Sequence, residues 1–408
     1  MSTNYLLDDS QETLFDIGRH PQSEQLRFVQ MCIDEGLDFA DELERHGISI
    51  DDLEYEIKAP SVRGDYATLD RFRHSSNRIP FVSLFAGCGG MDLGFEAAGF
   101  SHQVAVEINP LFARTMRENR PNWNVMAPPS HSGDVSRLYE TANGIKEQAK
   151  ITIPYEGIFV GGPPCQPFSI AANQRFSRAG GDFKRTGFQH KHGNLLFCYI
   201  ELIEMFLPLS FVIENVPGLV DVDNGEQMAN AVHRLRLLGY DVAEPLILNA
   251  ADFQVPQNRF RLFLIGSRGT RTFVPPPKSD KASIVGPALR LGKKSVNNHQ
   301  PREHKAASIL RYMQLAVGER DQLGRVDRLD PLRPSKTIIA GGTKGGGRSH
   351  LHPYIPRTLT VRECARIQTF PDDYVFLGPT ARQFTQVGNA VPPVLAAQIA
   401  SSVRKSFF

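Results

Sequence analysis

The sequence predicts an α/β protein built on a doubly wound, Rossmann-like sheet, with a smaller loop-rich domain and a helical N-terminal extension. Between residues 79 and 268, short apolar runs rich in β-branched and aromatic residues alternate with longer amphipathic stretches, which is the pattern of strands connected by helices. Glycine-rich or polar segments follow the ends of several runs, as at the ligand-binding edge of open α/β sheets. From residue 267 onward, proline and glycine increase and the apolar periodicity fades, which predicts the loop-rich domain.

The length and composition of the chain indicate how many domains it has and in which cellular compartment it works. A chain of 408 residues exceeds one typical domain, and we expect an extension and linker over 1–78, a sheet domain over 79–268, a loop-rich domain over 269–374 and a returning segment over 375–408. No apolar stretch is long enough to span a bilayer, and the N-terminus lacks a signal-peptide pattern. The five cysteines are scattered and form no CxxC pair, so we expect a reducing cytoplasm, no disulfide framework and no metal site.

The charge is unevenly distributed along the chain. The net charge is only +2, but residues 1–60 hold fifteen acidic and four basic residues, which leaves +13 on residues 61–408. A basic body favours a polyanionic partner. The acidic extension, whose apolar residues recur at helical spacing between 26 and 43, is interpreted as a helical cap on the main domain. The alternative, an operator-binding helix-turn-helix, disagrees with its charge.

The first predicted strand, helix and strand resemble the site of a nucleoside cofactor. A β-rich run over 81–85 enters a glycine turn, and a helix pattern follows, so a ligand can approach the backbone closely. The next strand, over 102–106, ends in Glu107, where an acidic residue can accept hydrogen bonds from both ribose hydroxyls. The alternative for Glu107 is a carboxylate near a helix N-terminus. A helix over 109–119 follows, and Asp134 offers a carboxylate at another strand end, suited to an adenine amino group.

One cysteine lies in a sharp turn after a buried strand. The apolar run 157–160 leads into Gly-Gly-Pro-Pro-Cys-Gln-Pro-Phe-Ser, whose glycines and prolines force a turn. Cys165 therefore lies just past a strand end, where such sheets hold their chemistry. A buried structural cysteine is the alternative. The basic, glycine-bearing stretch 170–193 that follows is either a mobile lid that contacts phosphates or a solvated loop.

Further polar residues are placed at the ends of later elements. A helix over 195–207 precedes a strand over 211–217 that contains Glu214, and a helix over 227–238 comes next. Gln257, Arg259 and Arg261 alternate before an apolar run, so we expect them to share one face of a strand and one site. A salt-bridged edge strand is the alternative. In the C-terminal part, Thr360 and Glu363 predict a capping box at the start of a helix, and residues 388–393 open the last helix.

Together these stretches resemble the DNA (cytosine-5) methyltransferases. The matching segments are FAGCGG, the acidic Glu107, GPPCQPFS, ENV, QNRFR, RTLTVRECARIQTFP and GNAVPP, which occur in the family's order and cover about residues 79–393. The extension lies outside the resemblance. The chain departs from many members at Ile108, where they carry a large aromatic residue that stacks on the cofactor adenine.

The resemblance implies the cofactor S-adenosylmethionine and a set of roles. Cys165 would add to C6 of a cytosine flipped out of the duplex, Glu214 would hold N3 and the exocyclic amine, and Arg261, supported by Arg259 and Gln257, would hold O2. The residues expected at the cofactor are Phe85, Ala86, Gly87, Gly89, Gly90, Glu107, Ile108, Asp134, Pro163, Leu195 and Asn389. Residues 79–268 and 375–408 would form the catalytic domain, and 269–374 the target-recognition domain.

The expected function is site-specific methylation of double-stranded DNA by a monomeric enzyme in a bacterial restriction–modification system. The short chain without chromatin-reading modules favours that setting, in which a cognate restriction endonuclease would be the functional partner. Two alternatives remain. One is a tRNA cytosine-5 methyltransferase, which shares the motifs, and the other is a DNA-binding regulator that acts through residues 1–78.

Overall fold

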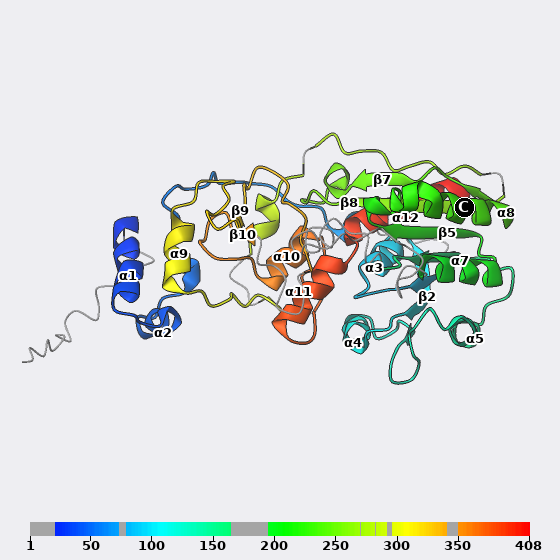
Figure 1. Cartoon of the computed structure of the whole chain (residues 1–408), viewed down its shortest axis with the longest axis horizontal. Helices are drawn as coiled ribbons and strands as arrows, with labels where there is room; N and C mark the ends of the chain where they lie inside the picture. The colour runs from blue at the N-terminus through cyan, green and yellow to red at the C-terminus, as the bar shows by residue number, and fades with distance from the viewer. Residues whose placement is uncertain are drawn as a thin grey trace, which may run out of the picture.

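An eight-stranded sheet forms the centre of the larger part of the protein (Figure 1). The structure is a computed structural model that describes residues 21–72, 79–164, 195–269, 271–281, 283–291, 296–340 and 350–408. Cys165 and the predicted lid over 170–193 lie outside these residues. Among the described helices, none is long and apolar enough to cross a membrane.

The strand order places a topological switch in the middle of the sheet. Five strands are parallel in the order β3-β2-β1-β4-β5, and β8 then pairs antiparallel with β5 and carries β6 and β7 on its other edge. The chain order reverses between β1 and β4, where open α/β sheets bind their ligands. The strands are β1 (Ile79–Leu84), β2 (Phe100–Val106), β3 (Val125–Met126), β4 (Ile158–Gly161), β5 (Ser210–Asn215), β6 (Tyr240–Val242), β7 (Leu246–Asn249) and β8 (Phe260–Arg268).

Helices cover both faces of the sheet, which confirms the predicted doubly wound fold. On one face, α3 (Gly90–Ala97) and α12 (Pro393–Phe407) share an apolar core with β1, β4 and β5. These two helices pack closely, since a Cβ on Gly94 would lie 2.5 Å from the Ala396 methyl carbon. On the other face, α5 (Leu138–Ala149), α7 (Leu195–Phe206) and α8 (Glu226–Leu237) form a second core. The C-terminal helix α12 therefore completes the sheet domain, although it lies far from these strands in the sequence.

Local sequence signals placed most of these elements correctly. The helix α4 (Pro110–Asn119) begins at Asn109, whose side chain accepts hydrogen bonds from two backbone N–H groups of the first turn. The helix α10 (Val361–Ile367) has the predicted capping box of Thr360 and Glu363. The helices α5 and α11 (Thr380–Asn389) and the strands β3, β6 and β7 were not predicted.

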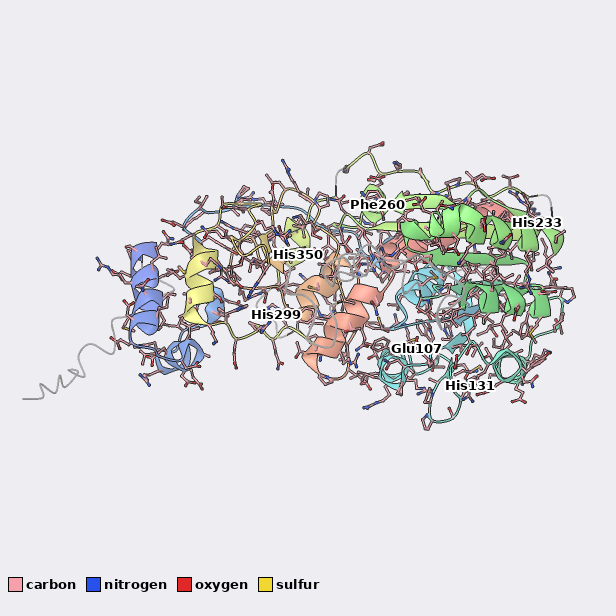
Figure 2. The ribbon with its side chains drawn as sticks, in the orientation of Figure 1. Glu107, His131, His233, Phe260, His299 and His350 are labelled. Atoms are coloured by element: carbon pink, nitrogen blue, oxygen red, sulfur yellow. The ribbon has the colours of Figure 1, made fainter. Side chains whose placement is uncertain are left out.

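The loop-rich part, residues 271–374, contains little regular structure in the residues described. Its elements include α9 (Ala306–Met313), α10 and the short parallel pair β9 (Asp327–Arg328) and β10 (His350–Leu351). Buried arginines organise it: Arg328 donates to the carbonyls of Leu315 and Pro353, and Arg362 donates to those of Asn297 and Pro371. His299 and His350 lie in this part, far from Glu107 beside the sheet (Figure 2).

The N-terminal helices pack on the loop-rich part, so the expectation of a cap on the main domain is wrong. The helices α1 (Gln22–Asp34) and α2 (Phe39–Arg45) form one apolar cluster with α9 and β10, and α1 lies beside α9 at the end of the molecule away from the sheet (Figure 1). After α2, a single 3-10 turn (Ile50–Asp52) leads into a segment without regular structure. There the Tyr55 hydroxyl donates to the His352 carbonyl at 2.8 Å. Apolar periodicity predicts that a helix buries one face, but not which surface it buries that face against.

Candidate active site

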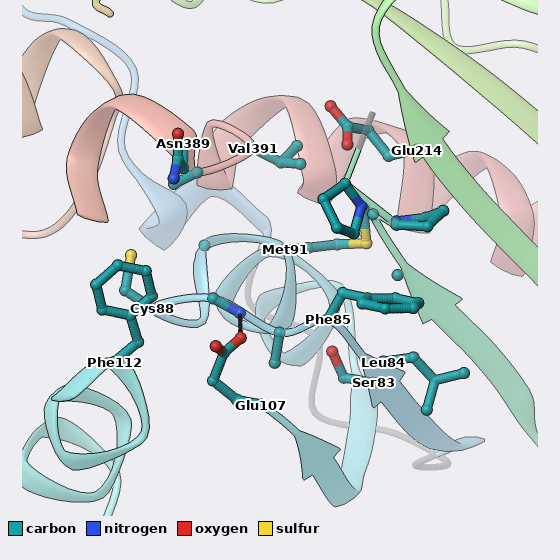
Figure 3. A pocket seen from close by; sticks show the side chains of 18 of the residues that line it. Ser83, Leu84, Phe85, Cys88, Met91, Glu107, Phe112, Glu214, Asn389 and Val391 are labelled. Atoms are coloured by element: carbon teal, nitrogen blue, oxygen red, sulfur yellow. Dashed lines mark hydrogen bonds between the residues drawn. The ribbon is translucent and has the colours of Figure 1, made fainter. Parts of the chain in front are cut away.

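A cavity of about 550 Å³ opens at the carboxyl ends of β1, β2, β4 and β5. The turn after β1, the ends of β2, β4 and β5, and the segment between α11 and α12 all line it, as Figure 3 shows for eighteen of its residues. Of the predicted site residues, Phe85, Ala86, Gly87, Gly90, Glu107, Ile108, Asp134, Pro163, Leu195, Glu214, Arg261 and Asn389 line this cavity. The strand switch thus brings together residues as far apart in the sequence as Phe85 and Asn389.

The turn between β1 and α3 has a backbone shape that depends on glycine. Gly87 and Gly89 have φ angles of 60° and 80°, in the left-handed region. A Cβ on Gly87 would meet nothing within 4 Å, whereas one on Gly89 would lie 2.9 Å from the ring of Trp123. Gly87 therefore leaves open backbone beside the cavity, and Gly89, which is not among the lining residues, allows the turn to pack against the protein.

Glu107 fixes this turn from the end of β2. One of its oxygens accepts the Gly87 N–H, the bond drawn in Figure 3, and the other accepts the Asn109 N–H, both at 2.7 Å. The side chain is buried, and burial raises the pKa of Glu107 to about 7, although the two backbone donors act in the opposite direction. A carboxylate has about four acceptor positions, so each oxygen retains capacity for another donor from the cavity.

Ile108 and Asp134 form the next section of the wall. Ile108 is 58% exposed although it lines the cavity, and buried Val135 lines it as well. The Asp134 carboxylate accepts hydrogen bonds from the Ser136 N–H and hydroxyl, at 3.0 and 2.6 Å. The protein therefore presents aliphatic surface and an oriented carboxylate at this end of the cavity.

Glu214 and Arg261 form an ion pair at the other end. The Arg261 Nε lies 2.8 Å from Glu214 Oε1, and both side chains are largely buried. Burial raises the pKa of Glu214, against the opposing effect of Arg261 and Arg259, and burial lowers the pKa of Arg261. A Cβ on Gly162 would lie 2.6 Å from Glu214 Oε2, so glycine at that position makes room for the carboxyl group.

The turn that leads to Cys165 is tied to the same strand end. The Asn215 side chain donates to the Pro163 carbonyl at 3.2 Å, and Pro163 and Pro164 both line the cavity. Cys165 itself lies outside the described residues, but it directly follows Pro164 in the chain.

The expectation that Gln257, Arg259 and Arg261 share one site is wrong for the first two. The strand β8 begins only at Phe260, and Gln257 and Arg259 are buried ahead of it. Arg259 donates to the carbonyls of Ile338, Gly388 and Ala390, and Gln257 donates to the Gln368 side chain and accepts the Ile338 N–H. These contacts hold distant segments in place, so only Arg261 reaches the cavity.

Sequence reasoning missed several wall residues. Gln386, Met91, Phe112 and Val216 line the cavity. Gln386 lies on α11 three residues before Asn389, so a helix prediction over that stretch would have placed it near the same wall.

Comparison with known proteins agrees with this geometry. The profile of the C-5 cytosine-specific DNA methylases matches residues 79–405. The chain belongs to this family. The methylase is 34% identical over 349 residues to the Type II methyltransferase M1.HphI of Haemophilus parahaemolyticus, covering 80% of this chain and 87% of that protein. It is 32% identical to the Type II methyltransferase M.PspPI of a Psychrobacter strain, over 80% and 79% of the two chains.

Solved structures support the same assignment. A putative DNA modification methyltransferase encoded within an E. coli prophage superposes with a TM-score of 0.64 at 26% identity, covering 80% of the methylase and 99% of that chain. The Dnmt2 methyltransferase of S. pombe shares the fold, with a TM-score of 0.55 at 18% identity. The match covers 81% of the methylase and 100% of that chain. The resemblance drawn from the motifs is confirmed, and the methylase is a C-5 cytosine-specific DNA methylase. Residues 1–78 precede the matched region.

Proposed function

We propose that the methylase transfers the methyl group of S-adenosylmethionine to C5 of a cytosine flipped out of duplex DNA, through a covalent bond from Cys165 to C6. The observation that carries this proposal is that the Glu214–Arg261 pair and the turn before Cys165 share one cavity with the glycine turn and Glu107. Residues 79–268 and 375–408 would perform the reaction and 269–374 would read the DNA. The enzyme would act as a monomer in the cytoplasm and protect DNA against a cognate endonuclease.

The cofactor end of the cavity fits a nucleoside that carries an amino-acid chain. The volume of about 550 Å³ lies within the usual range of small-molecule sites. Glu107 would accept the ribose hydroxyls, Asp134 the adenine amino group, and open backbone at Gly87 would allow close approach. Asn389 and the turn from Phe85 to Gly90 would contact the remaining chain. When bound, the cofactor supplies an electrophilic methyl group.

The substrate end fits attack on the cytosine ring. The Cys165 thiolate would add to C6, which breaks the aromaticity and makes C5 nucleophilic enough to take the methyl group, with S-adenosylhomocysteine as the leaving group. Loss of the C5 proton would then expel the Cys165 sulfur and restore the ring. The four described cysteines are poor alternatives, because burial raises the pKa of Cys32, Cys88, Cys198 and Cys364.

Glu214 and Arg261 would polarise the base from its other edge. A carboxyl group with a raised pKa can hydrogen-bond to N3 and share a proton with it as charge develops there, while the Arg261 guanidinium would bind O2. Because ring addition is impossible within a stacked duplex, the base must leave the stack to reach this pair.

The substrate class is tested by incubating the protein and labelled S-adenosylmethionine with either duplex DNA or tRNA. We expect label in DNA only, at one sequence, which bisulfite sequencing of DNA from an expressing host would identify. Label in tRNA alone would instead establish the RNA alternative. The regulator alternative is disfavoured because residues 1–60 hold fifteen acidic and only four basic residues, whereas a helix that reads DNA needs positive charge around it.

The affinity for S-adenosylmethionine should rise with pH between 6 and 8. Ribose hydroxyls donate to the ionised carboxylate, and Glu107 has a pKa of about 7 in the free protein, so protonation below that value opposes binding by up to about tenfold per pH unit. Calorimetric titration of wild type and Glu107→Gln at several pH values measures this. The variant should bind more weakly at pH 8 and lack the slope, and an equal slope in both proteins would contradict the role of Glu107.

Replacing Ile108 by phenylalanine should tighten cofactor binding. Ile108 is 58% exposed at the cavity wall, so a ring has space there and can stack on a flat base. An aromatic pair contributes about 0.5–1.5 kcal/mol beyond area burial, which corresponds to roughly two- to tenfold in dissociation constant. The matched control is Ile247→Phe on strand β7, where an isoleucine is similarly exposed outside the cavity, and it should leave the constant unchanged.

A further inference from the structure

The glycine turn is held from outside by a segment near the other end of the chain. The Tyr374 hydroxyl donates to the Cys88 carbonyl at 2.5 Å, and the Cys88 thiol donates to the Gln386 carbonyl at 3.4 Å. The backbone of Cys88 is therefore bonded to Tyr374, which lies 286 positions further along the chain, and its side chain to Gln386, which lies 298 positions further. The turn does not depend on its own sequence alone for its shape.

Tyr374 is itself rigidly placed. Its side chain is 1% exposed, and its ring packs against Phe370 and Phe376 at centroid distances of 5.3 and 5.4 Å. Its backbone carbonyl accepts a hydrogen bond at 2.5 Å from the buried guanidinium of Arg362 on α10. Burial also raises the pKa of Tyr374 well above its usual value of 10, so the hydroxyl keeps its proton and remains a donor.

The contact acts on the part of the turn that faces the cavity. Cys88 lies between Gly87, whose N–H donates to Glu107, and Gly89, which packs against Trp123. A turn in which Phe85, Gly87 and Gly89 all have left-handed φ angles is an uncommon conformation. Each fixed hydrogen bond lowers the entropic cost of holding this turn in place for a ligand.

We propose that Tyr374 is a positioning residue for the cofactor: its hydroxyl holds the glycine turn in its binding shape, so that cofactor affinity depends on the segment that follows α10. This inference rests on the proposed function, because it concerns the same S-adenosylmethionine site. Tyr374 is not among the residues that line the cavity, so its effect is exerted through Cys88.

The test compares Tyr374→Phe with Tyr240→Phe in the full chain. Tyr240 is also buried and donates to a backbone carbonyl, that of Pro208, at 2.7 Å, but on β6 at the far edge of the sheet. Both variants keep their ring packing and lose one comparable hydrogen bond, so their melting temperatures should fall by similar amounts. Only Tyr374→Phe should weaken S-adenosylmethionine binding, by about three- to tenfold. The KM for S-adenosylmethionine should rise in this variant, while kcat and the KM for DNA stay unchanged.

The outcomes separate this inference from the function on which it rests. If wild type and Tyr374→Phe bind S-adenosylmethionine equally, the positioning role is wrong while the proposed function stands. If Tyr240→Phe weakens binding as much, the effect is one of general stability and the inference is again wrong. If the wild-type protein binds no S-adenosylmethionine, both the inference and the proposed function fail.

Discussion

Cys165→Ser should abolish methyl transfer while binding of DNA and cofactor persists. Serine nearly matches cysteine in volume, so the fold should remain, but its hydroxyl is a far weaker nucleophile near neutral pH. Transfer of labelled methyl groups to duplex DNA measures the loss, and filter binding of DNA together with calorimetry of S-adenosylmethionine measures the retained affinities. Loss of binding along with activity would point to a structural role instead.

Duplex DNA with 5-fluorocytosine at the target site tests the covalent bond between Cys165 and the base directly. Fluorine at C5 prevents the elimination that releases the thiol, so the wild-type enzyme should remain covalently attached to the DNA and Cys165→Ser should not. Cys88→Ser is the matched control, because Cys88 is buried with a raised pKa beside the same cavity, and it should still form the adduct. An adduct that persists in Cys165→Ser would overturn the assignment.

Arg357→Ala should be the most destabilising of the substitutions considered, by about 3–5 kcal/mol. The Arg357 guanidinium is buried between Asp51, in the N-terminal extension, and Glu363, in the first turn of α10, with N–O distances of 2.5 and 2.8 Å. Its removal leaves the Glu363 carboxylate buried without a counter-charge. Chemical denaturation should show the loss as a lower midpoint for the transition that includes the loop-rich part.

Arg234→Ala is the matched control for that substitution. Arg234 also contacts two carboxylates, those of Glu201 and Glu204, but its side chain is 36% exposed. Exposed pairs contribute at most about 1 kcal/mol. A comparable loss in both variants would mean that burial of the Arg357 network contributes little.

The pH dependence gives an independent check on Arg357. Arg357 helps to hold the pKa of Glu363 at about 2, below its usual 4.5, so this stabilisation is fully present above pH 4.5 and is lost as the pH falls toward 2. In Arg357→Ala the unpaired carboxyl group is relieved by protonation. The stability difference between the two proteins should therefore narrow as the pH falls, and a constant difference would contradict the assigned cause.

Short-range signals in the sequence determined much of the fold and of the end of the cavity that the glycine turn and Glu107 line. Thr360 and Glu363 make hydrogen bonds within one helical turn, and Glu107 bonds to Asn109 and to a glycine twenty residues away across one strand–helix–strand unit. Strand and helix periods follow from which neighbouring residues are apolar. Such features depend on residues close in the sequence, so they can be predicted from it.

The tertiary structure alone decided where distant segments meet. Arg259 looked like a partner of Arg261 in one site, yet it binds carbonyls up to 131 positions away and leaves only Arg261 at the cavity. The extension was predicted to be helical, but its position on α9 and the insertion of Asp51 beside Arg357 were not. The hydrogen bond from the Tyr374 hydroxyl to the glycine turn is another contact that the sequence did not predict. A buried polar group must find a hydrogen-bond partner. The residues near it in the sequence do not identify that partner, because the packing of distant segments against one another decides which groups meet.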